Sequence, residues 1–123
     1  MLELIAVFVA GGTGACFRLL LGRWVDLLCA PHLPNAGILA ANLLGSLAIG
    51  FGSALLPDGV WRVALLTGLL GGFTTYSAFA LLTVNIAGAG RWGLLAIQLG
   101  VHLIGGVLCV LAGVALARLG RGA

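Results

Sequence analysis

The sequence predicts an all-α integral membrane protein that crosses the bilayer four times. Of its 123 residues, 62% are hydrophobic and 7% are charged, and the mean hydropathy is +1.24. Soluble globular domains carry about 25% charged residues, so this composition excludes that class. Each crossing needs about 20 apolar residues, and four such segments follow one another with short polar connections. We therefore expect one transmembrane domain over 1–123, in the cell (inner or plasma) membrane.

The charged residues exclude several functional classes. The formal net charge of +3 comes from six arginines against Glu3, Asp26 and Asp58, which are scattered along the chain. They form no basic patch for nucleic acid, and no paired carboxylates or nucleophile with a base are present in the sequence. The three cysteines lack metal-ligand spacing, so we interpret them as small packing residues. We expect neither an enzyme nor a nucleic acid partner.

The first apolar segment runs from about Leu4 to Leu21, or on to Leu28 if the helix is longer. Its second half, GGTGACFR (residues 11–18), contains small residues that let a neighbouring helix approach closely. Arg18 lies well inside the segment, so it either snorkels to the interface or pairs with a protein group. The prolines at 31 and 34 predict a loop that ends this helix.

The second segment, Asn35 to Leu56, carries no formal charge and has one strongly polar interior residue, Asn42. A buried amide must find partners, so Asn42 is either a bond between helices or a ligand in a site, and both alternatives stay open. The residues from Leu56 to Gly59, Leu-Pro-Asp-Gly, are typical of a turn. Trp61 and Arg62 after it form an interfacial anchor pair.

The third segment, Val63 to Ala87, is interrupted by GLLGGFTTYSAF at residues 68–79. Two adjacent glycines and two threonines predict an unwound turn between half-helices that end near Leu70 and begin near Thr75. An unpaired backbone group in hydrocarbon costs several kcal/mol, so such a break needs protein or a polar cavity around it. Broken helices offer carbonyls to cations and amides to anions. The break marks a candidate ion site; the alternative is a kink that serves packing.

The fourth segment, Trp92 to Ala117, contains Gln98 and His102, which lie four apart and share a helix face. They are either a hydrogen-bonded interior pair or the lining of a wet path. Tyr76 and Phe79 in the third segment lie three apart. They either pack together or turn their electropositive ring edges toward an anion.

Three motifs in this order resemble the Fluc fluoride channels, also called CrcB. They are GGTGACFR in the first crossing, NLLGS with Gly50 in the second and GGFTTYSAF in the third. The third is similar to the family's GGxTTFSTF and is the specific one. The resemblance implies a broken third helix and a dual-topology antiparallel dimer with two fluoride pores along the subunit interface. It also implies a structural sodium ion (Na⁺) at the dimer centre.

The resemblance also assigns residues by position. Gly71 and Thr74 match the carbonyl donors of the sodium site. The candidate fluoride-pore residues are Asn42, Tyr76, Ser77, Phe79, Gln98 and His102. Several of these depart from the family pattern, because Tyr76 replaces a phenylalanine and Gln98 and His102 stand where tyrosine and serine are usual. A homodimer is expected, and the departures leave one subunit of a heterodimer as the alternative.

The leading functional hypothesis is a fluoride-selective channel that exports fluoride passively, since fluoride enters cells as the neutral acid and ionises inside. The alternative is a small dual-topology proton-coupled multidrug transporter. That chemistry needs a carboxylate deep in the first helix, whereas Glu3 lies at the membrane edge. His102 would make fluoride flux rise toward acidic pH if it faces the pore, and would do nothing if it is packed away; we favour the packed alternative.

The arginines predict no preferred orientation in the membrane. One face receives Arg18, Arg23 and Arg91, and the other receives Arg62, Arg118 and Arg121. An excess of positive residues on one side normally sets orientation, and three against three gives no excess. We therefore expect insertion in both orientations and an antiparallel two-fold dimer.

Overall fold

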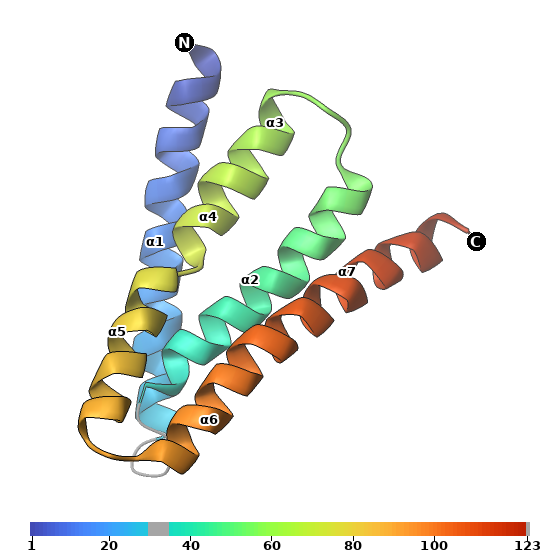
Figure 1. Ribbon diagram of the computed structural model, residues 1–123. Coiled ribbons are helices and arrows are strands. Elements are labelled where there is room, and N and C mark those ends of the chain that lie inside the picture. Colours follow the sequence, from blue (N-terminus) through green and yellow to red (C-terminus); the bar gives the residue numbers. More distant parts are fainter. Residues whose placement is uncertain (30–34, 123) are drawn as a thin grey trace.

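The computed structural model describes residues 1–29 and 35–122, and within these ranges every regular element is helical (Figure 1). Two of the elements, η1 and η2, are short π-helical stretches inside longer helices. The elements are α1 (Leu2–Cys29), α2 (Ala36–Leu55), α3 (Val60–Val63), η1 (Ala64–Leu70), α4 (Gly71–Phe73), α5 (Tyr76–Gly88), α6 (Trp92–Gly100), η2 (Val101–Gly105) and α7 (Gly106–Arg121).

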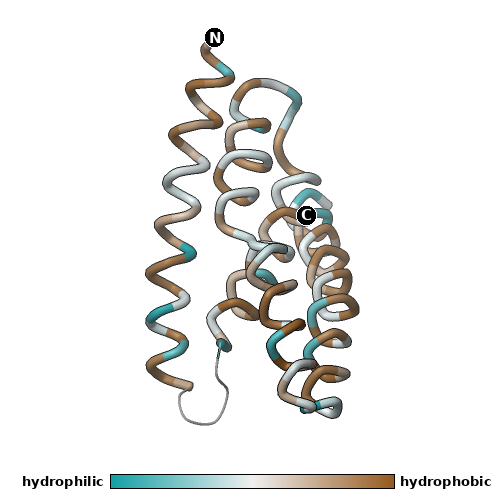
Figure 2. The backbone as a smooth tube through the Cα atoms, turned by 60° about the vertical axis from the view of Figure 1, so that its left-hand side comes forward, coloured by the Kyte–Doolittle hydropathy of each residue, from teal (hydrophilic) through white to brown (hydrophobic). Residues whose placement is uncertain are grey.

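In the described part of the chain, four helical segments are long and apolar enough to cross a membrane. They are Leu2–Cys29, Ala36–Leu55, Val60–Gly88 and Trp92–Arg121. Figure 2 shows mostly apolar residues along all four, with hydrophilic positions near the ends and a few within the helices. The predicted all-α fold with four crossings is therefore confirmed, and the chain is a multi-pass membrane protein. The first helix takes the longer of the two predicted lengths, and the predicted loop at residues 31–34 lies outside the described residues.

The four crossings pack in two pairs. The third crossing lies beside α1, and α7 lies along α2 (Figure 1). The α2–α7 contact depends on glycines, because a Cβ atom at Gly50 would collide with the Val110 carbonyl and one at Gly113 with the Leu47 carbonyl. Small residues at both positions let the two backbones touch, which is the usual basis of helix association in a bilayer.

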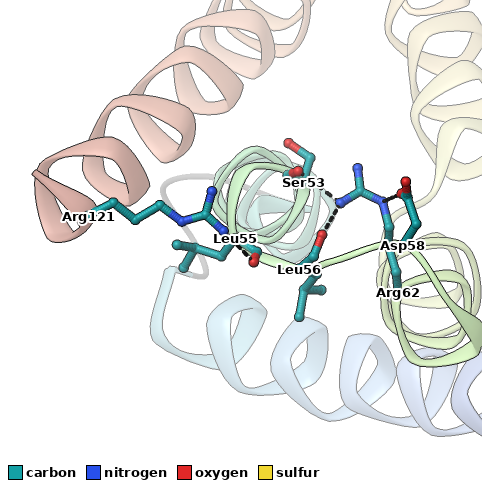
Figure 3. Close-up of polar contacts among 6 residues, drawn as sticks. All are labelled: Ser53, Leu55, Leu56, Asp58, Arg62 and Arg121. Atoms are coloured by element: carbon teal, nitrogen blue, oxygen red, sulfur yellow. Dashed lines mark hydrogen bonds and ion pairs between the residues drawn. The ribbon is translucent and has the colours of Figure 1, made fainter.

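Charged side chains from other elements cap both ends of α2. At its start, the Gly37 N–H donates to Asp26 Oδ1 of α1 at 2.9 Å. Beyond its end, Arg121 donates to the Leu55 carbonyl at 2.7 Å, and Arg62 donates to the Leu56 carbonyl (Figure 3). An anion at the amino end and cations at the carboxyl end both complement the helix dipole and satisfy its unpaired backbone groups.

These caps also place the charges at the two ends of the bundle. Arg62 and Arg121 lie on either side of the end of α2, where the turn to α3 begins (Figure 3). Arg91 follows α5 at the opposite end, where α5 connects to α6 (Figure 1). Positive charge is therefore present at both ends, as the sequence predicts.

Candidate functional site

The third crossing is broken at Thr74 and Thr75. Thr74 (φ −82°, ψ 161°) and Thr75 (φ −149°, ψ 110°) are extended, and they separate α4 from α5. The predicted break between two half-helices is therefore present. Its position differs from the prediction, because Gly71 is helical (φ −63°, ψ −37°) and the first half-helix runs on to Phe73 instead of ending near Leu70. β-Branched threonine prefers extended backbone, whereas the glycines continue the helix here.

Asn42 of α2 holds the break through two hydrogen bonds. Its Oδ1 accepts from the Thr75 N–H at 2.7 Å, and its Nδ2 donates to the Thr75 carbonyl at 3.1 Å. Thr75 is 8% exposed, so the amide satisfies both backbone groups of a buried unwound residue. Of the two alternatives for Asn42, the bond between helices is present. An amide has two N–H groups, so one stays available to a ligand.

Thr75 also starts the next helix. Its Oγ1 accepts from the Ala78 N–H at 3.2 Å, which is the usual bond of a helix N-cap. The Ser77 hydroxyl lies 3.3 Å from the same oxygen, and Ser77 is exposed. The first threonine of the motif therefore follows the end of one half-helix, and the second begins the other.

Arg18 supports the break from α1. Its Nε donates to the Gly72 carbonyl at 3.3 Å, in the last turn of α4. Pairing with the protein, one of the two alternatives for Arg18, is therefore the one in this structure. The α1 helix can come so close because Gly72 has no side chain, and a Cβ there would collide with the Gly11 carbonyl.

Three tilted rings lie in a row beside the break. Phe79 lies 5.7 Å from Tyr76 and 4.5 Å from His102, measured between ring centroids. Phe79 is 7% exposed and Tyr76 is 78% exposed, so the row runs from the inside of the chain to its surface. Of the two alternatives for Tyr76 and Phe79, the contact between the two rings is present, and a contact of their edges with an anion stays a prediction. The third ring, that of His102, belongs to the fourth crossing.

Gln98 and His102 are linked through the backbone. His102 Nδ1 lies 3.0 Å from the Gln98 carbonyl, while the Gln98 side-chain Nε2 lies 3.3 Å from Thr83 Oγ1 and 3.5 Å from the Phe79 carbonyl. Thr83 joins this group because its hydroxyl donates to the same Phe79 carbonyl at 2.8 Å. Thr83 lies four residues after Phe79, and a helical threonine often donates to the carbonyl four residues before it. This spacing could have predicted the bond between Thr83 and Phe79 from the sequence.

His102 lines two cavities. One, of about 300 Å³, is lined by residues that include Asn42, Ser46, Thr74, Tyr76, Phe79 and His102. The other, of about 100 Å³, is lined by residues that include Asn35, Leu82, Arg91, Gln98 and His102. The structure thus gathers most of the predicted pore residues around two adjoining spaces. Ser77 and Gly71 line neither of them.

The larger cavity is lined by groups that can hydrogen-bond and by aromatic rings. Among the described residues that line it, amide, hydroxyl, imidazole and aromatic groups are present and a carboxylate is not. Nor do the described residues contain a cluster of three His, Cys, Asp or Glu that could hold a metal ion.

A family model described as "CrcB-like protein, Camphor Resistance (CrcB)" matches residues 5–114. The chain belongs to the CrcB-like family. Three curated relatives, each named fluoride-specific ion channel FluC, align along almost the whole length. The protein of Albidiferax ferrireducens is 40% identical over 119 residues, which cover 93% of this chain and 89% of the relative. Those of Dichelobacter nodosus (43% over 124 residues) and Agrobacterium fabrum (37% over 123 residues) each cover 96% of this chain and 98% of the relative.

Membership in the CrcB-like family confirms the resemblance drawn from the three motifs. The matched range includes all three motifs, the break at Thr74 and Thr75, and both cavities. No individual site residue is tested by these matches. The roles of Asn42, Phe79, His102 and the carbonyls of Gly71 and Thr74 therefore stay predictions.

Proposed function

We propose that the chain is a subunit of a fluoride-selective channel that exports fluoride passively across the cell membrane. The observation that carries this proposal is the larger cavity, where an Asn42 amide and the Phe79 ring lie together at membrane depth without a carboxylate. The names of the relatives, 37–43% identical to this chain, point to the same ion.

The physical problem for such a channel is dehydration. Fluoride is small and strongly hydrated, so a narrow path must replace its water with hydrogen-bond donors. Asn42 retains one N–H beyond the one it gives to Thr75, and Ser77 offers a hydroxyl beside the break. The ring edges of Tyr76 and Phe79 add electropositive contacts.

The single chain leaves this path open on one side, which favours an antiparallel homodimer. Tyr76 is 78% exposed and Gly71 is exposed beside the break, at a depth where lipid offers no hydrogen bonds. A second copy would cover these groups. Because arginines stand at both ends of the bundle, neither orientation is favoured and the two copies can insert in opposite directions.

The break also fits a structural sodium ion at the centre of that dimer. In an unbroken helix the Thr75 N–H would donate to the Gly71 carbonyl, but here it donates to Asn42. The Gly71 carbonyl loses that donor, and the Thr74 carbonyl lies in extended backbone. Backbone oxygens suit a small hard cation. Gly71 and Thr74 of two copies would together supply four such oxygens.

The decisive experiment is fluoride efflux from liposomes that contain the purified protein, with valinomycin setting the membrane potential. The proposal predicts that fluoride flux follows the membrane potential and is unchanged by an imposed proton gradient. It also predicts that chloride does not cross under the same conditions. Uphill fluoride movement driven by protons would overturn it. For the multidrug alternative, proton-driven uptake of a lipophilic cation is the matching assay, and the lack of a carboxylate in the larger cavity speaks against it.

The same liposomes test the assembly. A homodimer requires flux from this chain expressed alone. Flux that needs a second, different subunit would assign the chain to a heterodimer.

A further inference from the structure

His102 occupies the junction of the two cavities. It lines both the larger cavity with Asn42 and Phe79 and the smaller cavity with Gln98 and Arg91. The ring also lies beside the Phe79 ring, at 4.5 Å between centroids. An anion that moved from one cavity into the other would therefore pass beside this imidazole.

The hydrogen-bond partner of Nδ1 determines which nitrogen carries the proton in the neutral ring. Nδ1 lies 3.0 Å from the Gln98 carbonyl, and a carbonyl can only accept. Nδ1 therefore carries the hydrogen. In the neutral ring, Nε2 is then an unprotonated acceptor whose lone pair repels an anion.

Nε2 is buried and has no hydrogen-bond partner among the described residues. A buried polar atom without a partner is uncommon and costs about 1–3 kcal/mol. Such an atom can be satisfied by water, by an ion or by a group of a second copy of the chain. Which of these it meets depends on the charges around it.

The charged groups around His102 favour an anion. Of the described residues that line either cavity, the other titratable or charged ones are Tyr76 on α5 and Arg91 between α5 and α6. α2, the break and α6 contribute none to these linings. A protonated imidazole would thus have no carboxylate to pair with. Arg91 makes the potential of the smaller cavity more positive, which also attracts an anion.

We propose that His102 is a proton-dependent anion ligand at the junction of the two cavities. In the protonated ring Nε2–H donates to fluoride, whereas in the neutral ring the same atom blocks its passage. This inference rests on the proposed fluoride channel, makes the protonation of His102 a condition for conduction, and replaces the packed alternative that the sequence favoured for this residue. Conduction is then highest in acid, where fluoride enters cells fastest as the neutral acid.

Voltage-driven fluoride efflux tests this inference, with equal pH on both sides of the liposome, from about pH 5.5 to about pH 8, where histidine ordinarily changes charge. Leak from protein-free liposomes is subtracted at each pH. Wild-type flux should fall as the pH rises, by up to about tenfold per pH unit, as expected for one required proton. His102→Gln keeps a donor at every pH and should conduct with little pH dependence. His102→Leu has no donor and should lose most flux throughout.

His32→Gln is the matched control, because it removes the other histidine of the sequence and should leave the pH dependence intact. Wild-type flux that does not change across this pH range would overturn the inference and leave the fluoride channel standing. Equal pH dependence in wild type and His102→Gln would do the same. An absence of voltage-driven fluoride flux at every pH, in wild type and both His102 variants, would overturn the channel itself.

Discussion

Asn42 and Thr75 are joined by two hydrogen bonds, in which the asparagine amide pairs with both the N–H and the carbonyl of the unwound threonine. This arrangement replaces the helical bonds that Thr75 gives up. It also leaves one N–H of the amide without a bond to Thr75, and Asn42 is one of the residues that line the larger cavity. The residue proposed to contact the anion is therefore the residue that holds the break in shape.

Asn42→Ala should lower stability because it leaves both backbone groups of Thr75 without a partner. Each unpaired buried group costs about 1–3 kcal/mol, so a loss of about 2–6 kcal/mol in the free energy of unfolding is expected. Reversible unfolding in detergent measures it. Asn85→Ala is the control, since Asn85 is exposed on α5, and it should change stability by less than about 0.5 kcal/mol. Equal effects in the two variants would contradict the role of the Asn42 bonds.

Asn42→Asp keeps the side-chain oxygen that accepts from Thr75 and removes the side-chain N–H groups that donate. The carboxylate can still accept from the Thr75 N–H, but it sets a negative oxygen against the Thr75 carbonyl and removes the donor for fluoride. Fluoride efflux should fall to the level of empty liposomes, with stability lowered less than in Asn42→Ala. Undiminished efflux in Asn42→Asp would remove Asn42 from the path.

Gly71 and Gly72 offer a matched pair that separates assembly from folding. A Cβ at Gly72 would collide with the Gly11 carbonyl, whereas one at Gly71 would have the Leu66 carbonyl at 3.9 Å as its nearest neighbour. Gly72→Ala should therefore destabilise the chain by about 1–3 kcal/mol through overpacking. Gly71→Leu should leave the subunit folded but block the dimer and its cation site.

Helical content and size-exclusion chromatography in sodium and in choline buffers distinguish the two effects. The wild-type dimer should be more stable in sodium, and Gly71→Leu should run as a folded monomer in both buffers. A Gly71→Leu protein that forms a wild-type dimer with sodium-dependent stability would count against the proposed site.

Phe79→Ile should reduce fluoride efflux strongly, because it removes the ring that lies between Tyr76 and His102. The isoleucine keeps the site apolar but offers no electropositive edge. Tyr76→Phe is the control, since it preserves the ring and removes the hydroxyl of an exposed residue. Retained efflux is expected for Tyr76→Phe. If both variants conduct like wild type, the aromatic edges play no part in conduction.

Asp26→Leu should destabilise the start of α2. The Gly37 N–H loses its acceptor, which is the loss of an N-cap, worth about 0.5–2 kcal/mol. Asp26→Asn retains a side-chain oxygen and should lose less. Thermal unfolding in detergent compares both variants with Glu3→Gln, where an exposed acid at the start of α1 is neutralised. An Asp26→Leu variant as stable as Glu3→Gln would show that this cap contributes little.

Dual topology can be tested at Ala89, an exposed residue in the connection between α5 and α6. In a variant whose three native cysteines are replaced, Ala89→Cys should react partially with a membrane-impermeant thiol reagent in intact cells. Partial labelling is expected because neither orientation is favoured. Complete labelling or complete protection would mean a single orientation, and would rule out an antiparallel homodimer in that host.

The sequence by itself determined the four crossings and the existence of the break. Long apolar segments leave a chain little choice in a bilayer, because every backbone polar group must be satisfied within a helix. Two glycines followed by two threonines then marked the interruption in the third crossing. The faces shared by Tyr76 with Phe79 and by Gln98 with His102 followed from helical periodicity.

The tertiary structure decided where the break lies and which groups hold it. Asn42 and Thr75 are 33 residues apart, and Arg18 reaches Gly72 across 54 residues. Helical periodicity relates neighbours within one helix and says nothing about which side chain of another helix meets them. The bonds of Asn42 to Thr75, and the choice between the interface and a protein partner for Arg18, therefore required the packed helices. Their separation is set by close contacts at glycines such as Gly72.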